Sequence, residues 1–401
     1  MQDISCDIFC AVIDNLGDAG VCWRLARQLA REHGWRVRLW IDDPSPLERL
    51  APDRQAIPVE VRRWQGDLPA THPADVVIEA FACELPPRYV AAMATLPRPP
   101  VWLNLEYLSA EDWVAGCHTL PSPHPRLPLI KYFFFPGFVP GTGGLLRECP
   151  FAIPLLASGA TGAVPMLAAD LADAVPMLAA DLADAVPMLA ADPADAVPPA
   201  PTFGETLEVS LFCYDNSALP ALLEAWRDGD APVRCRVADG LPRQQVESWL
   251  GEPFPSGCRH ARGALELDAQ PFFSQDGYDQ LLAACQLNFV RGEDSLVRAQ
   301  WAERPFVWQA YPQTNGAQRA KLDALLERYC ALLDTSTAVA THAFWQAWNG
   351  QGDIAARIAE TWPVFRAALP ALAAQAPRWA RQIAAHGDLA ANLVKFCQSK
   401  L

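Results

Sequence analysis

The first candidate for chemistry is the loop Asp14-Asn15-Leu16-Gly17-Asp18-Ala19-Gly20, which separates an apolar run from a helical pattern. Its glycines allow a tight turn and a close approach of a ligand to backbone N–H groups. Asp18 is well placed to cap the helix and Asp14 to cap a turn. A carboxylate at the end of a strand is also placed to act as a general base. Because two acids repel a phosphate, the loop suits a neutral or cationic acceptor.

The second candidate is Arg291-Gly292-Glu293-Asp294-Ser295, which also lies between a strand pattern and a helix pattern. A helix start offers N–H groups and a partial positive charge to a phosphate. Arg291 can add a bidentate contact to a phosphate or carboxylate, and Glu293 can bond sugar hydroxyls. The alternative interpretation is a well-capped helix, since Asp294 and Ser295 are both favoured at helix starts.

Several aromatic residues fall at the ends of predicted strands or just before predicted helices. Aromatic rings in such positions can stack on a nucleobase, although most serve the core in α/β proteins. The residues in question are Phe212, Tyr214, Phe272, Phe273 and Tyr311, with Gln275 beside the middle pair.

These candidates are positioned by an alternation of strand and helix patterns, which is typical of parallel α/β sheets. In the first half we expect strands within 4–13, 35–43, 75–81 and 101–108, and an amphipathic helix that ends at Gly34 with Arg24, Arg27 and Arg31 off its apolar face. The aromatic run 129–138 suits either the core or the lip of a cleft. In the second half we expect strands within 206–214, 233–240, 287–292 and 305–313, helices within 218–229, 278–286 and 293–302, and a helix-rich end over 353–401.

Length and composition favour two domains and exclude several classes of protein. The chain has 401 residues, 51% of them hydrophobic, and a net charge of −14. Such an acidic chain is a poor match for nonspecific nucleic-acid binding, which needs Lys and Arg along the phosphates. The first residues lack a basic, apolar signal segment, and the uncharged stretch 149–169 is broken by proline and glycine, so no membrane association is expected. We therefore expect a cytoplasmic protein.

Metal, hydrolase and dinucleotide motifs are absent from the sequence. The 12 cysteines form no CxxC pair, and no HExxH, GxSxG, GxxxxGK[ST] or GxGxxG pattern occurs. The cysteines are expected to be small buried residues rather than disulfides or metal ligands. No metal and no cofactor are predicted.

An eleven-residue repeat interrupts the middle of the chain. AVPMLAADLAD at 163–173 recurs at 174–184, and 185–195 repeats it with Pro193 in place of leucine. Proline every eleven residues breaks the helix that alanine favours, so we interpret the segment as a duplicated linker. The expected organisation is an acceptor-binding domain over 1–155, a linker over 156–205 and a nucleotide-sugar-binding domain over 206–380. A final helix, about 381–401, is expected to pack on the first domain.

Three segments together resemble the bacterial elongation factor P arginine rhamnosyltransferases: IDNLGDAGVCWRLARQL (13–29), SLFCYDN (210–216) and the block from Tyr278 to Gln313 that contains RGEDS. The resemblance implies a GT-B type α/β fold, with two Rossmann-like domains facing across an interdomain cleft. It implies inverting, metal-independent transfer of L-rhamnose from dTDP-β-L-rhamnose to the guanidinium of one arginine of elongation factor P. That modification supports translation of polyproline stretches.

The resemblance also assigns residues. It implies that Asp18 is the general base and that Asp14 and Glu293 are the other acids required for activity. It places the nucleotide sugar against Asn15, Gly17, Phe212, Tyr214, Phe272, Gln275, Arg291, Glu293, Asp294, Ser295 and Tyr311.

Two other functions stay open from the sequence. One is a GT-B glycosyltransferase with another acceptor, such as a lipid or small molecule, although the chain lacks a basic amphipathic stretch for a membrane surface. The other is a noncatalytic nucleotide-binding or scaffold protein.

Overall fold

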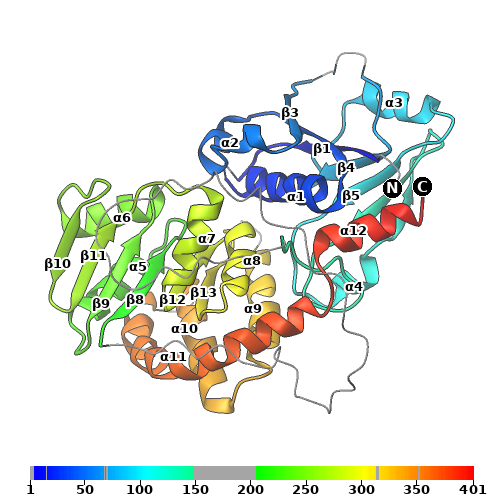
Figure 1. Cartoon of the computed structure of the whole chain (residues 1–401). Helices are drawn as coiled ribbons and strands as arrows, with labels where there is room; N and C mark the ends of the chain where they lie inside the picture. Colours follow the sequence, from blue (N-terminus) through cyan, green and yellow to red (C-terminus); the bar gives the residue numbers. More distant parts are fainter. Residues whose placement is uncertain are drawn as a thin grey trace, which may run out of the picture.

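The protein is built around two α/β sheets, one in each half of the chain (Figure 1). The computed structural model describes residues 4–14, 16–66, 68, 71–148, 205–312, 316–350 and 353–401. The repeats at 163–195 and the expected boundary at 155–156 lie outside the described residues. We call 4–148 the N-terminal half and 205–384 the C-terminal half.

The N-terminal sheet has seven strands, and only its edge strand β6 runs antiparallel to its neighbour. In spatial order they are β3 (Val59–Arg63), β2 (Arg36–Ile41), β1 (Ser5–Cys10), β4 (Val76–Ala80), β5 (Val101–Leu105), β7 (Ile130–Phe134) and β6 (Pro121–Pro123). Its helices are α1 (Gly17–His33), α2 (Ser45–Leu50), α3 (Pro87–Thr95) and α4 (Trp113–Cys117), with a 3-10 turn at Arg54–Ala56.

The C-terminal sheet has six strands, again with one antiparallel edge strand, β10. Their order is β10 (Arg259–Arg262), β11 (Leu265–Ala269), β9 (Val233–Val237), β8 (Leu207–Leu211), β12 (Leu287–Arg291) and β13 (Phe306–Gln309). Its helices are α5 (Leu219–Arg227), α6 (Leu241–Leu250), α7 (Gln275–Ala284), α8 (Asp294–Trp301), α9 (Ala317–Cys330), α10 (Thr335–Trp348) and α11 (Ile354–Ala384).

The inner strands of both sheets carry buried apolar side chains, as the sequence patterns indicated. The inner strand β1 has five of its six residues buried, and its neighbours β4, at the centre of the sheet, and β5 are buried throughout. Such continuous burial is expected where helices cover both faces of a parallel sheet. Two Rossmann-like halves that face each other form the GT-B arrangement, so the expected fold class is confirmed.

The last helix, α12 (Leu389–Gln398), lies on the N-terminal half although it follows α11 in the chain (Figure 1). Phe396 packs against Tyr132 of β7, with ring centroids 5.2 Å apart. Leu145 and Asp388 form an isolated parallel bridge beside it. Residues 381–384, which we expected to belong to this last helix, are the end of α11.

Helix α11 runs for 31 residues despite prolines at 363, 370 and 377. Its buried face carries aromatic and aliphatic side chains that pack on the C-terminal half, and this burial offsets the backbone hydrogen bonds that the prolines remove. Within the described residues, no helix combines the length and the apolar character that a bilayer crossing requires.

Candidate active site

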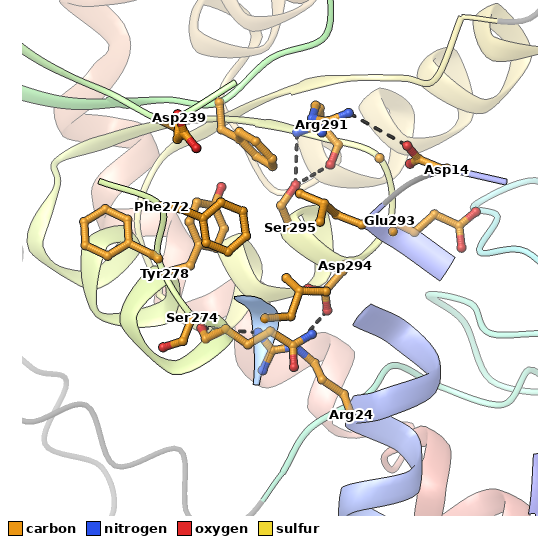
Figure 2. A pocket seen from close by; sticks show the side chains of 18 of the residues that line it. Asp14, Arg24, Asp239, Phe272, Ser274, Tyr278, Arg291, Glu293, Asp294 and Ser295 are labelled. Carbon is orange, nitrogen blue, oxygen red and sulfur yellow. Dashed lines mark hydrogen bonds and ion pairs between the residues drawn. The ribbon is translucent and has the colours of Figure 1, made fainter. Parts of the chain in front are cut away.

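A cavity of about 720 Å³, partly open to solvent, lies where loops of the two halves meet (Figure 2). The N-terminal half contributes the loop after β1, the first half of α1 and the end of α2. The C-terminal half contributes the segments after β8, β9, β11 and β12. The expected site residues that line it are Asp14, Gly17, Phe212, Tyr214, Phe272, Gln275, Arg291, Glu293, Asp294 and Ser295.

Asp18 holds the first loop together from inside. Helix α1 begins at Gly17, so Asp18 lies in its first turn. The prediction that Asp18 is the N-cap of this helix is therefore wrong. Instead, its Oδ2 accepts the backbone N–H groups of Ile13 and Asp14, both at 2.8 Å. The side chain reaches back because Gly17 closes a tight turn on the Asp14 carbonyl. Its second oxygen, Oδ1, has no hydrogen-bond partner among the described residues.

Asp18 is also nearly buried, with 4% of its surface exposed, and does not itself line the cavity. Burial raises its pKa, while the two backbone N–H groups act in the opposite direction. A carboxylate with a raised pKa and one unoccupied oxygen suits a proton acceptor better than an ordinary surface aspartate does.

Asp14 points across the cleft toward the C-terminal half. Its Oδ2 accepts the hydroxyl of Tyr214 at 3.0 Å, and its Oδ1 lies 3.9 Å from a guanidinium nitrogen of Arg291. Gly292 makes this approach possible. Its φ is +63°, and a Cβ there would lie 2.7 Å from the Tyr214 hydroxyl and 3.5 Å from Asp14 Oδ2.

The Arg291 guanidinium is fixed between two rings. It lies 4.5 Å from the ring centroid of Phe212 and 4.2 Å from that of Tyr214. Cation–π contacts of this kind orient a guanidinium without neutralising it. The Ser295 hydroxyl accepts the backbone N–H of Arg291 at 3.1 Å and donates to the carbonyl of the same residue. These two hydrogen bonds fix the turn that leads into α8. Arg291 and the start of α8 thus present positive charge to the cavity.

Glu293 reaches from the C-terminal half to the N-terminal half. Its Oε2 accepts the backbone N–H of Leu108 at 3.0 Å. Burial raises the pKa of Glu293 to about 7, with Asp18 and Asp14 adding to the shift and Lys321 opposing it. The three expected acids are therefore electrostatically coupled at one place, although they come from loops about 275 residues apart in the chain.

Phe272 and Gln275 line the side of the cavity that α2 covers. The guanidinium of Arg49, on α2, lies 3.7 Å from the Phe272 ring centroid and pairs with Asp239 at 2.7 Å. Gln275 donates its amide to the carbonyl of Gly20 at 3.0 Å, so it joins the two halves rather than facing open space.

Besides Asp18, one more expected residue of the described chain, Tyr311, does not line the cavity. Tyr311 is 47% exposed and lies outside the lining, where its ring packs edge-on against Tyr214 at 5.3 Å. Asn15 lies outside the described residues.

Sequence reasoning missed Arg24, Arg49 and Asp239, which also line or border the cavity. Arg24 was expected off the apolar face of its helix, yet it is fully buried and pairs with Asp294 at 2.8 Å. Its position in the motif WRLARQL was the available signal, but nothing in that motif shows that the other half covers it. Among the described residues, no group of three or more His, Cys, Asp or Glu is arranged as metal ligands.

Comparison with known families decides the affiliation. Residues 6–398 match the model of the family described as elongation factor P (EF-P) rhamnosyltransferase EarP. The chain belongs to this EF-P rhamnosyltransferase family. Members similar to it include the protein-arginine rhamnosyltransferase of Pseudomonas aeruginosa, 44% identical over 400 residues with 98% of each chain covered. That of Shewanella oneidensis is 35% identical over 412 residues, with 97% of this chain and 96% of the other covered.

A solved structure from the same EF-P rhamnosyltransferase family supports the fold. It concerns the structural basis for EarP-mediated arginine glycosylation of translation elongation factor EF-P. The match has a TM-score of 0.61 at 30% identity and covers 99% of this chain and 100% of that one.

Proposed function

We propose that this protein transfers L-rhamnose from dTDP-β-L-rhamnose to a guanidinium nitrogen of one arginine of elongation factor P in the cytoplasm. The observation that carries the proposal is the meeting of Asp14, Asp18 and Glu293 beside Arg291 and the start of α8. The first group of side chains is acidic and suits a cation. The second is basic and suits a diphosphate.

On the donor side, the C-terminal half supplies what a diphosphate leaving group requires. Arg291 and the N-terminus of α8 balance the charge that develops on the phosphate oxygen as the bond to the sugar breaks. These groups carry the positive charge in the proposed reaction, which requires no metal. Phe272 offers a ring for the thymine base.

On the acceptor side, the N-terminal half supplies Asp14 and Asp18, and the C-terminal half adds Glu293. Arginine has a pKa above about 12, so its proton must leave as the new bond forms. The guanidinium nitrogen attacks C1 of rhamnose from the face opposite the phosphate, the C1–O bond breaks, and dTDP departs. The nitrogen loses its proton to Asp18, and Asp14 and Glu293 hold the remaining positive charge. Attack from the opposite face inverts the configuration at C1.

The test is the intact mass of elongation factor P after incubation with this protein and dTDP-L-rhamnose in the presence of EDTA. We expect a gain of one deoxyhexose that maps to a single arginine. If dTDP binds by calorimetry and no mass is gained, the acceptor is a different molecule or the protein only binds nucleotide. If EDTA alone abolishes the gain, the metal-independent mechanism is wrong.

A further inference from the structure

Arg24 of α1 reaches from the N-terminal half to Asp294 of the C-terminal half (Figure 2). Its side chain is fully buried and lines the cavity. Its Nε lies 2.8 Å from Asp294 Oδ1, and its two terminal nitrogens each lie 3.1 Å from an oxygen of Asp279. Glu148 adds a contact at 3.3 Å. One guanidinium therefore ties α1 to both α7 and α8.

Asp294 is the partner that matters for ligand binding. It is the first residue of α8 and lines the cavity beside Arg291 and Glu293. Burial raises its pKa, and Arg24 opposes that shift by favouring the charged carboxylate. Without Arg24, this carboxylate would be a buried anion with a reduced counter-charge at the place where α8 offers its positive end.

We infer that Arg24 is a positioning residue of the donor site: it fixes and neutralises Asp294, so that the half bearing the acceptor loop completes the charge balance for a nucleoside diphosphate. The inference rests on the proposed function, because it takes a nucleotide sugar to be the cavity's ligand. It follows that donor affinity depends on contact between the two halves. By linkage, the donor then stabilises that contact by an equal amount.

Arg27, one turn further along α1, separates this role from that of an ordinary interface ion pair. It also crosses to the C-terminal half, where it lies 3.1 Å from Asp276, and it contacts Glu148. It is nearly as buried as Arg24, with 9% of its side chain exposed. It neither contacts Asp294 nor lines the cavity. Loss of Arg27 therefore weakens the same interface without changing the charge next to the donor.

The experiment compares dTDP affinity, by isothermal titration calorimetry, for the full-length wild type, R24Q and R27Q. Removing one charge-assisted contact leads us to expect at least about tenfold weaker binding for R24Q. We expect R27Q to stay within about twofold of wild type, since neither Arg27 nor its partners Asp276 and Glu148 line the cavity. Wild-type binding tests the proposed function, and the difference between the two variants tests this inference.

R24K keeps the inference testable if R24Q does not fold, and D294N with R24Q/D294N completes a double-mutant cycle where R24Q folds. R24K retains the charge but loses the forked geometry, so its affinity should lie between those of wild type and R24Q. In R24Q/D294N the uncompensated anion is gone, so the double variant should lose less affinity than the two single changes combined. Equal losses in R24Q and R27Q would overturn the inference. So would additive losses in the double variant, or wild-type affinity in a folded R24Q or R24K.

Discussion

The hydroxyl of Tyr214 donates to the carboxylate of Asp14 at 3.0 Å, and this hydrogen bond joins the two halves of the protein at the cavity between them. The ring of Tyr214 also packs against the guanidinium of Arg291. One side chain therefore contacts both Asp14, which the proposal assigns to the acceptor, and Arg291, which it assigns to the donor. The orientation of Asp14 thus depends on a residue of the opposite half.

Replacing Tyr214 with phenylalanine should remove this hydrogen bond and keep the ring under Arg291. We expect kcat to fall about tenfold or more, since a hydrogen bond to a charged group is worth about 1.5–3 kcal/mol. The KM for the donor should stay close to the wild-type value. Steady-state kinetics with elongation factor P measure both quantities, and a change confined to donor KM would show that Tyr214 serves only Arg291.

Replacing Asp18 with asparagine should remove a proton acceptor without opening the loop. The amide oxygen of asparagine can still accept the N–H groups of Ile13 and Asp14. We expect transfer to fall by a factor of about 10² to 10⁴, as for loss of a general base, with dTDP affinity unchanged. Wild-type turnover in this variant would exclude Asp18 as the base.

Replacing Gly292 with alanine should reduce activity through a change of cleft geometry, in addition to reducing stability. The residue has φ +63°, and the new Cβ would lie 2.7 Å from the Tyr214 hydroxyl. We expect a stability loss of about 1–2 kcal/mol from the left-handed backbone and at least about a tenfold loss of kcat/KM from displacement of Tyr214.

Gly251, at the end of α6, offers the matched control for that substitution. It has φ +73°, and a Cβ added there would meet no atom of the described residues within 4 Å. G251A should therefore lose similar stability, by thermal unfolding, and retain kcat/KM. Equal activity losses in the two variants would assign the effect of G292A to stability alone.

Glu293 should give the reaction a pH dependence near neutrality. Burial raises its pKa to about 7, so the carboxylate that holds a cationic acceptor is fully charged only above that pH. We expect kcat/KM to rise through pH 7 and to flatten above about pH 8, and E293Q should lose this inflection together with most of its activity. A profile in E293Q that still rises through pH 7 would assign the titration to another group.

The raised pKa of Glu293 should also make stability depend on pH, and here the quantity should fall, not rise, with increasing pH. The folded state holds the Glu293 proton more tightly than the unfolded state, whose pKa is near 4.5. The free energy of unfolding should therefore fall as pH rises from about 4.5 to about 7, by up to about 3 kcal/mol, and then level off. E293Q should lack this decrease, which urea titrations at several pH values would measure.

Deletion of the repeats at 163–195 should leave catalysis nearly unchanged. The entropic cost of a connection grows only with the logarithm of its length, so removing these residues should change stability by about 1 kcal/mol or less. We expect kcat/KM within about threefold of wild type. A larger loss of activity would assign the repeats a role in binding the acceptor.

The sequence predicted most strands because buried parallel strands are short apolar runs, as in 4–13 and 287–292. It also predicted the end of α1, where Gly34 adopts the left-handed conformation. The hairpin of β10 and β11 was missed because β10 reads Arg-His-Ala-Arg, a polar edge strand without an apolar pattern. The unbroken α11 was not foreseen because local rules treat each proline as a helix end.

The position of a cavity residue could be predicted where a single loop carries it, as for Asp14 and Glu293, whose roles stay predictions from the resemblance. The burial of residues at the interface between the two halves could not be predicted. Arg24 and Arg27 look like a solvated helix face from the sequence, yet they are 0% and 7% exposed because α7 and α8 cover them. Periodicity describes one element at a time, and these contacts depend on the docking of two.

The bridge between Leu145 and Asp388 has a consequence for how the cleft can open. Leu145 lies near the end of the described N-terminal half, and Asp388 is where the chain returns to that half, so these two points are side by side. Gly144 and Gly387 allow this close contact, since a Cβ at Gly144 would lie 2.5 Å from the Gly387 carbonyl oxygen. The return crossing is thus fastened to the N-terminal half at one point, which resists sliding there and permits rotation. We therefore expect the two halves to rotate about a hinge at this corner. The largest displacement should occur at the opposite end of the cleft, where Arg49 forms an ion pair with Asp239.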